Sequence, residues 1–172
     1  GVPFRREELE SLGAEFELTA EPTWLTEDIV VSGQEPMKTS FEEVADNLLL
    51  AQGGSDRGDG YVLDPILDDQ SVFLRTDQGL VVVLGCAHRG MINIIEYARE
   101  LTGEERIHMV LGGTHLGPAS PEQQQATLSA LEKIDPQWIG VSHCTGLEMA
   151  ADVRERFRDR FFFNNVGTAL SF

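Results

Sequence analysis

Positions 80–88 read Leu80-Val81-Val82-Val83-Leu84-Gly85-Cys86-Ala87-His88, an apolar run that ends in small residues and a histidine. The same pattern recurs twice further along the chain. These repeats are Ile107-His108-Met109-Val110-Leu111-Gly112-Gly113-Thr114-His115 and Trp138-Ile139-Gly140-Val141-Ser142-His143-Cys144. Short aliphatic runs rich in β-branched residues predict buried strands, and each is followed by a segment with helical periodicity. The three stretches therefore predict strands of one sheet, alternating with helices.

Turn and capping residues predict the elements around these strands. Thr76-Asp77-Gln78-Gly79 is a hairpin signal between two strand-like runs, and Ser120 before Pro121 is typical of a helix start. Strands that pair early and alternate with helices late predict an α/β fold with a mixed sheet flanked by helices. The predicted elements are strands over Ser71–Arg75, Leu80–Leu84, Ile107–Leu111 and Trp138–Val141, and helices over Gly90–Leu101, Pro121–Ile134 and Leu147–Phe157.

The two ends of the chain give weaker patterns. We expect a helix over Arg5–Ser11, strands near Glu15–Leu18 and Asp28–Val31, and a helical turn or two within Phe41–Leu50. Glycine, proline and aspartate punctuate residues 52–69, which predicts an irregular loop. At the other end, Phe161–Phe163 and Thr168–Leu170 are expected to form short strands.

The composition excludes several classes of partner. The chain has 172 residues, a length that fits one domain, and its net charge is −16. Such a charge repels nucleic acid and anionic membranes, so neither is an expected partner. No apolar run approaches the roughly 18 residues that a membrane-spanning helix requires. A cytoplasmic location is the default expectation, and the acidic surface suits either a high-salt cytoplasm or simple solubility.

The histidines are the residues best placed for chemistry. In α/β folds, ligands gather at the carboxyl ends of the strands, where His88, His115 and His143 all stand. Because neutral imidazole is the commonest metal ligand in proteins, we predict that these three residues form a metal site. The alternatives are a helix-capping or buried role for His88 and His143, and a substrate contact for His115. His108 lies within its strand and is expected to be structural.

Two cysteines and two acids flank the predicted site. Cys86 and Cys144 each stand within two residues of a strand-end histidine, so they are expected near the site as thiols rather than as a structural disulfide. Cysteine and histidine together would suit zinc, although a packing role beside the site explains them as well. Asp68 and Asp69 precede the hairpin and are candidates to support the site from outside the ligand set.

Several motifs, taken in order, resemble the metallo-β-lactamase superfamily, and more narrowly its dihydropterin–ribofuranosylaminobenzene phosphate synthase-like branch. The motifs are Asp68-Asp69-Gln70, Gly79-Leu80-Val81-Val82, Gly85-Cys86-Ala87-His88, Gly112-Gly113-Thr114-His115-Leu116 and His143-Cys144-Thr145-Gly146. The resemblance implies a four-layer αββα sandwich with one or two metals, zinc by expectation, at the edge between two sheets. It implies that His88 closes the ligand set of one metal and that His143 binds the other. His115 stands where the family usually places a bridging aspartate.

The superfamily's hallmark His-x-His-x-Asp-His is absent from these 172 residues. The resemblance therefore predicts that residues 1–172 form a single domain corresponding to the carboxy-terminal part of a longer metallo-β-lactamase-fold chain. Metal binding by this part alone is expected to be partial or absent.

The leading interpretation is a metal-dependent hydrolase-like or pterin-synthase-like enzyme that acts on a small-molecule substrate and is incomplete in this chain. The alternative is a non-catalytic binding or interaction module that has lost the metal motif. Self-association, or pairing with the missing half, is expected to cover the exposed sheet face. The substrate stays open because one fold hosts many reactions.

Overall fold

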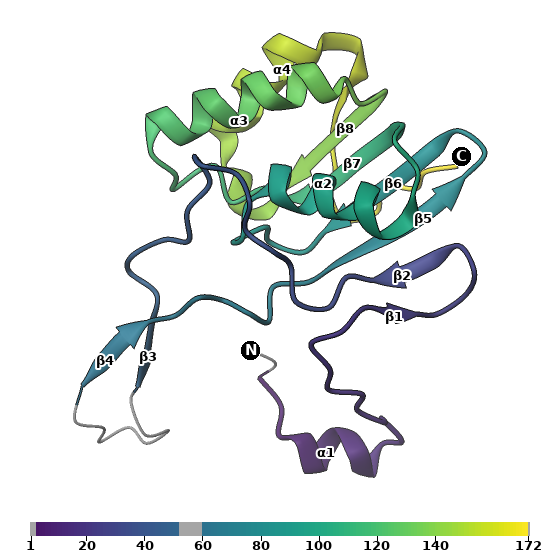
Figure 1. The fold of residues 1–172 in the computed structure, drawn as a ribbon, viewed down its shortest axis with the longest axis vertical. Helices are drawn as coiled ribbons and strands as arrows, with labels where there is room; N and C mark the ends of the chain where they lie inside the picture. The colour runs from purple at the N-terminus through teal and green to yellow at the C-terminus, as the bar shows by residue number, and fades with distance from the viewer. Residues whose placement is uncertain (1–2, 52–59, 172) are drawn as a thin grey trace.

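A computed structural model describes residues 3–51 and 60–171 of the chain. Its centre is a mixed seven-stranded sheet in the order β1-β2-β5-β6-β7-β8-β9 (Figure 1). The strands are β1 (Thr23–Trp24), β2 (Ile29–Val31), β5 (Ser71–Thr76), β6 (Gly79–Leu84), β7 (Ile107–Gly113), β8 (Trp138–Ser142) and β9 (Phe161–Phe163). Strands β1, β2, β5 and β6 pair antiparallel, whereas β6, β7, β8 and β9 pair parallel. The α/β class with a mixed sheet is therefore confirmed.

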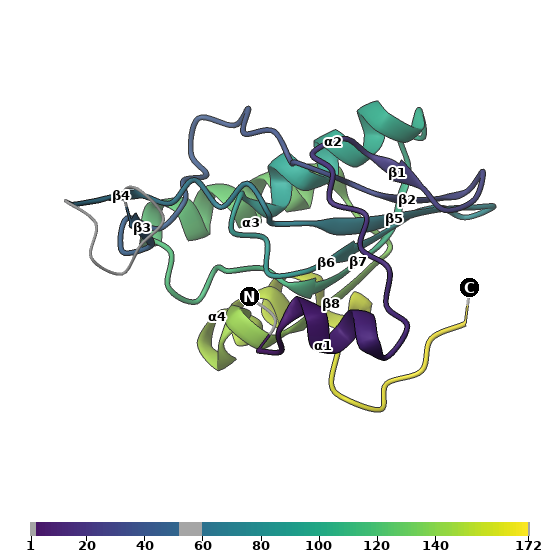
Figure 2. The same ribbon diagram turned by 90° about the horizontal axis from the view of Figure 1, so that it is seen from below.

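Three helices connect the parallel strands. They are α2 (Met91–Thr102), α3 (Pro121–Ile134) and α4 (Leu147–Phe157), and two 3₁₀ turns, η2 (His143–Thr145) and η3 (Arg158–Arg160), flank α4. The predicted bounds of α3 and α4 are both matched. Ser120 begins α3 by accepting a hydrogen bond from the backbone N–H of Gln123. Figure 2 shows α2 and α3 together on one side of the sheet.

The hydrophobic core lies between this side of the sheet and the helices. Phe73, Val82, Val110 and Ile139 point into it from four neighbouring strands, and the buried residues of α2, α3 and α4 join the same cluster. The alternate residues of the strands form a second apolar face. That face carries Val72, Leu74, Val81, Val83, Met109 and Leu111, which the strand register places side by side. The carboxyl-terminal segment passes on this second side (Figure 2).

Three sequence predictions are wrong. Residues 15–18 alternate in polarity as a strand would, but they are exposed and have no strand neighbour. Phe41–Leu50 forms no helix: its Glu42 side chain instead accepts hydrogen bonds from backbone N–H groups at the start of α2, and its last two residues begin strand β3 (Leu49–Ala51). Thr168–Leu170 forms no strand, since the N–H of Thr168 donates to the carbonyl of Asn165 in a turn.

Two peripheral elements lie outside the main sheet. Helix α1 (Arg6–Ser11), predicted from the sequence, buries none of its residues. A separate two-stranded ribbon, β3 (Leu49–Ala51) paired with β4 (Tyr61–Leu63), projects from the body (Figure 1). It falls partly in the loop predicted over 52–69, of which residues 52–59 lie outside the described part. Among the described residues, no helix is long and apolar enough to cross a membrane.

Candidate metal centre

The three predicted histidines stand at one edge of the sheet. Strands β6, β7 and β8 run parallel in adjacent positions, with Leu84 opposite Gly112 and Gly113 opposite Ser142. His88 follows the end of β6, His115 follows β7, and His143 begins the turn η2 directly after β8. Their convergence thus follows from parallel pairing, since the carboxyl ends of parallel strands meet at one edge.

The imidazoles are close to one another. The ring centroids of His88 and His115 lie 3.9 Å apart, with the ring planes tilted by 42°. Burial lowers the pKa of His115, and the neighbouring His88 and His143 lower it further. His115 is therefore kept neutral at physiological pH, which is the form of imidazole that binds metal ions.

His88 carries an unused donor or acceptor. Its Nδ1 is buried and has no hydrogen-bond partner. Asp69 lies beside it, accepts a hydrogen bond from the backbone N–H of Arg89 at 2.9 Å, and is buried, whereas Asp68 is exposed. Burial raises the pKa of Asp69, and the Arg89 N–H and the nearby His88 offset part of that rise. Of the two acids predicted to support the site, Asp69 reaches it.

Both cysteines reach the same site as free thiols. The Sγ atoms of Cys86 and Cys144 lie 3.0 Å apart, and Cys86 Sγ lies 3.6 Å from Nδ1 of His115. One ligand atom from each of these three residues falls within 4.8 Å of the others. Burial, together with the contact to Cys144, raises the pKa of Cys86 to about 12, so its thiol is protonated at neutral pH. Sulfur and imidazole nitrogen are donors that suit zinc, and the orphaned Nδ1 of His88 adds another.

The backbone at this edge is strained. Ala87, His115 and His143 adopt φ values of 55°, 50° and 53°, the left-handed region that non-glycine residues avoid. Each such residue costs on the order of 1 kcal/mol or more and persists where the surrounding structure holds it. Strain of this kind clusters at functional sites, and here each strained residue is, or adjoins, a candidate ligand.

Buried polar residues that sequence reasoning missed hold the loops behind the site. Arg89, buried, donates to the carbonyl oxygens of Glu35 and Pro65. Glu42 accepts hydrogen bonds from the backbone N–H groups of Ile92 and Asn93, each at 2.8 Å, and so caps α2 from a distant loop. These contacts join residues about 25 to 55 positions apart and leave no local sequence pattern. In the sequence, no local feature distinguishes Glu42 from the adjacent Glu43.

A pocket of about 380 Å³ opens over His88 and His115, whereas His143 is exposed and lines a separate pocket beside Phe163 and Asn165. His88 and His115 lie in its wall, together with the loop 43–48 and residues 118–120 and 123 at the start of α3. His108, in contrast, is buried in β7 and contacts Gln137 through Nδ1 at 3.0 Å, away from this pocket. A small molecule could thus contact the candidate ligands directly.

Comparisons with known proteins show what the chain as a whole is similar to. No family model matches the chain. Over 170 residues it is 28% identical to a 7,8-dihydropterin-6-methyl-4-(β-D-ribofuranosyl)-aminobenzene-5′-phosphate synthase of Methanocaldococcus jannaschii, covering 97% of this chain and 56% of that protein. An uncharacterized protein of the same archaeon is 28% identical over 157 residues, covering 91% of this chain and 55% of its own length.

A solved structure matches the fold. It is Tm1679, described as a metal-dependent hydrolase of the β-lactamase superfamily, with a TM-score of 0.73 and 25% identity over 92% of this chain and 58% of that one. The chain thus spans little more than half the length of the relatives it matches. The resemblance to the metallo-β-lactamase superfamily and its pterin synthase-like branch, indicated by the sequence motifs, is confirmed in both sequence and fold.

Proposed function

We propose that this chain supplies one part of the metal site of a metallo-β-lactamase-fold enzyme with hydrolase-like or pterin-synthase-like chemistry. The observation that carries the proposal is that His88, His115 and His143 follow three adjacent parallel strands, with the rings of His88 and His115 3.9 Å apart and the thiols of Cys86 and Cys144 beside His115. Relatives named as a pterin-related synthase and as a metal-dependent hydrolase support it. No observation favours the alternative of a non-catalytic module.

Zinc is the proposed metal. His88 and His143 would hold it, and His115 would either bind it or contact substrate. A bound zinc would lower the pKa of its water to about 7 and polarise a substrate oxygen. The chain's own residues would orient this site: Asp69 fixes the loop that carries His88, and the pocket walls exclude part of the bulk solvent around the substrate.

The number of available protein ligands predicts weak zinc binding by this chain alone. A catalytic zinc site uses about three protein ligands plus water, and the superfamily draws most of its set from the His-x-His-x-Asp-His segment. We expect partial zinc occupancy that falls as the pH drops through roughly 6.5, because each imidazole must be neutral to bind. Activity is expected only where that segment is also present.

The test is zinc titration by calorimetry on the purified chain and on two variants, His88→Ala and His143→Ala. Both substitutions should abolish the binding. His108→Gln is the matched control, since His108 lies outside the pocket, and it should bind zinc like the parent. Tight stoichiometric binding that survives both alanine substitutions would contradict the assignment.

We further propose that the second apolar face of the sheet is covered by another protein layer, either a second copy or the half of the fold that its relatives also contain. The face is continuous across β5, β6 and β7; Val81 and Met109 are already buried within this chain, and the remaining residues of the face are half-buried, which leaves their edges open to another layer. Light scattering of the isolated chain should show self-association. A stable monomer over a wide concentration range would contradict coverage of this face by a second copy.

A further inference from the structure

Cys86 and Cys144 meet across an intervening strand. Cys86 follows β6 and Cys144 follows β8, and β7 lies between these two strands in the sheet. Strands two positions apart are separated by about 10 Å, so their side chains meet only where the middle strand makes room. Gly113 of β7 does so: a Cβ atom there would lie 3.0 Å from Cys144 Sγ and 3.2 Å from Cys86 Cα.

The two sulfurs are held close by several contacts. Their separation of 3.0 Å is only about 1 Å longer than a disulfide bond. Cys144 Sγ also lies 3.2 Å from the backbone nitrogen of His115 and 3.4 Å from the carbonyl oxygen of Cys86. The residues next to the thiols in sequence, Ala87 and His143, both have left-handed backbone conformations. The fold therefore maintains this arrangement at an energetic cost.

Small molecules can reach the pair. Both cysteines are half-buried rather than enclosed, and each stands in a connecting segment, not within a strand. A connecting segment can shift by the ångström that bond formation requires more easily than the centre of a sheet can.

We propose that Cys86 and Cys144 are a thiol pair that low-molecular-weight disulfides convert reversibly into an intramolecular disulfide. One cysteine attacks the small disulfide, which forms a mixed disulfide and releases one small thiol. The second cysteine then attacks the protein-bound sulfur, forms the Cys86–Cys144 bond and releases the second small thiol. The two electrons and two protons of the protein thiols end on the released thiols, and a dithiol reductant reverses both steps.

The disulfide would also alter the candidate metal centre, and this consequence rests on the proposed function. A sulfur in a disulfide is not a thiolate, which is the form that binds zinc. Cys144 contacts the backbone of His115, so a shift of its sulfur would reach that residue as well. Oxidation should therefore weaken zinc binding, and bound zinc should slow oxidation.

Mass spectrometry tests the inference on the metal-free protein. After incubation with excess oxidised glutathione, acid quenching and alkylation, the intact chain should lose two hydrogens and accept no alkyl group. Tryptic digestion should then yield residues 76–89 joined to residues 134–154. Dithiothreitol should restore two alkylation sites.

Two controls keep the outcome decisive. Cys86→Ser and Cys144→Ser should each stop at a stable mixed disulfide with one glutathione. In denaturing urea, at the same glutathione concentration, the ratio of crosslinked parent to mixed disulfide should fall at least roughly tenfold, because the fold no longer holds the thiols together. Two independent glutathione adducts on the folded parent, with no joined peptide, would overturn the inference.

A parallel incubation with zinc separates the two proposals. A crosslink that forms at the same rate with and without zinc leaves the thiol pair established and removes the cysteines from the metal site. Slower crosslinking in zinc supports both.

Discussion

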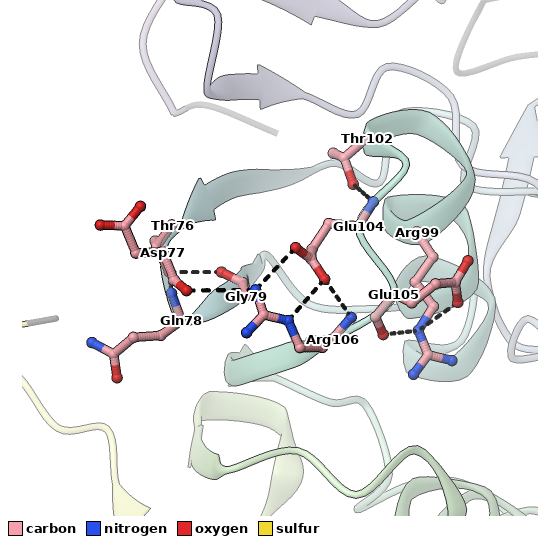
Figure 3. A network of polar contacts seen from close by, with 9 residues as sticks. All are labelled: Thr76, Asp77, Gln78, Gly79, Arg99, Thr102, Glu104, Glu105 and Arg106. Atoms are coloured by element: carbon pink, nitrogen blue, oxygen red, sulfur yellow. Dashed lines mark hydrogen bonds and ion pairs between the residues drawn. The ribbon is translucent and has the colours of Figure 1, made fainter.

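The two ends of the parallel strands differ in how their polar groups are used. At the carboxyl end, histidines, thiols and strained residues are packed together, and several buried polar atoms have no partner. At the amino end of β6 and β7, Arg106, Glu104 and Arg99 form an exposed network with the hairpin turn and the end of α2 (Figure 3). Exposed ion pairs contribute little to folding stability, so this network is typical of an ordinary charged surface. Unsatisfied and strained groups are concentrated at the end where chemistry is proposed.

The largest expected contrast comes from one glycine at each end. Gly112 in β7 has φ +127°, and a Cβ there would lie 2.2 Å from the Leu84 carbonyl oxygen. Gly103, after α2, has φ +72° but open space around it. Gly112→Ala should destabilise the chain by about 3–5 kcal/mol through overpacking and backbone strain, and Gly103→Ala by only about 1 kcal/mol. Urea denaturation of both variants measures the difference in the free energy of unfolding. Equal losses of stability would show that the backbone around Gly112 can shift to accept a side chain.

The second contrast is in how folding stability depends on pH, and it is expected to arise from Glu35. Burial raises the pKa of Glu35 to about 7, nearby Asp69 raises it too, and Ser71, Ser32 and Arg89 offset only part of the rise. The folded chain therefore keeps a proton that the unfolded chain releases near pH 4.5. The contribution of Glu35 to stability is therefore fully present below that pH and is lost as the pH rises through about 7.

Glu35→Gln should remove this part of the pH dependence, which is on the order of 3 kcal/mol for a shift of this size. Denaturation midpoints at pH 5 and pH 8 provide the measurement. Burial also raises the pKa values of Glu42 and Asp69, so the parent keeps some slope of the same sign, and the difference between parent and variant isolates Glu35. If the denaturation midpoint changed with pH equally in the parent and in the variant, the raised pKa of Glu35 would be contradicted.

A smaller effect is expected from the cap of α2. The residue before this helix is Gly90, which has no side chain, so the Glu42 carboxylate takes over and accepts from Ile92 and Asn93. A Cβ on Gly90 would collide with that carboxylate, which explains why glycine suits the position. Glu42→Gln keeps the shape but replaces one acceptor by a donor, and should cost about 2 kcal/mol. Thermal unfolding at neutral pH measures the loss, and an unchanged midpoint would mean that the loop repositions.

These cases show what a sequence reveals about this fold. The helices α3 and α4 could be predicted because their signals are local: Ser120 and Pro121 begin one, and apolar periodicity defines the other. The placement of the three histidines at one edge could be predicted because parallel strands end together. Their contacts could not: His115 lies against His88 and the two cysteines, whereas His143 lines a separate pocket. Glu15–Leu18 has the alternation of a strand, but an alternating pattern cannot report that no neighbouring strand exists to pair with it.

The support of the site could not be predicted in the same way. Glu42 reaches α2 across about 50 residues, and Arg89 reaches Glu35 across a similar separation. Each contact depends on the tertiary fold, and no spacing rule links the two partners. Proximity of Cys86 and Cys144 was expected from the strand ends, but their direct contact depends on the missing side chain of Gly113.

The smallest effect on stability is expected at Glu104, near the amino end of β7, and its dependence on pH is opposite to that of Glu35. Hydrogen bonds from the backbone N–H and the side chain of Arg106 lower the pKa of Glu104. Its contribution to stability is therefore present above pH 4.5 and is lost as the pH falls through the lower folded-state pKa, whereas Glu35 acts in the reverse direction. Because the Arg106 side chain is 64% exposed and the Glu104 side chain 27%, a double-mutant cycle of Glu104→Gln and Arg106→Gln should give a coupling of about 0.2–1 kcal/mol that weakens in salt. The cycle is measured by urea denaturation at pH 7, at low and high salt. A coupling comparable with the effect of Gly112→Ala would remove the distinction between the two ends of the sheet.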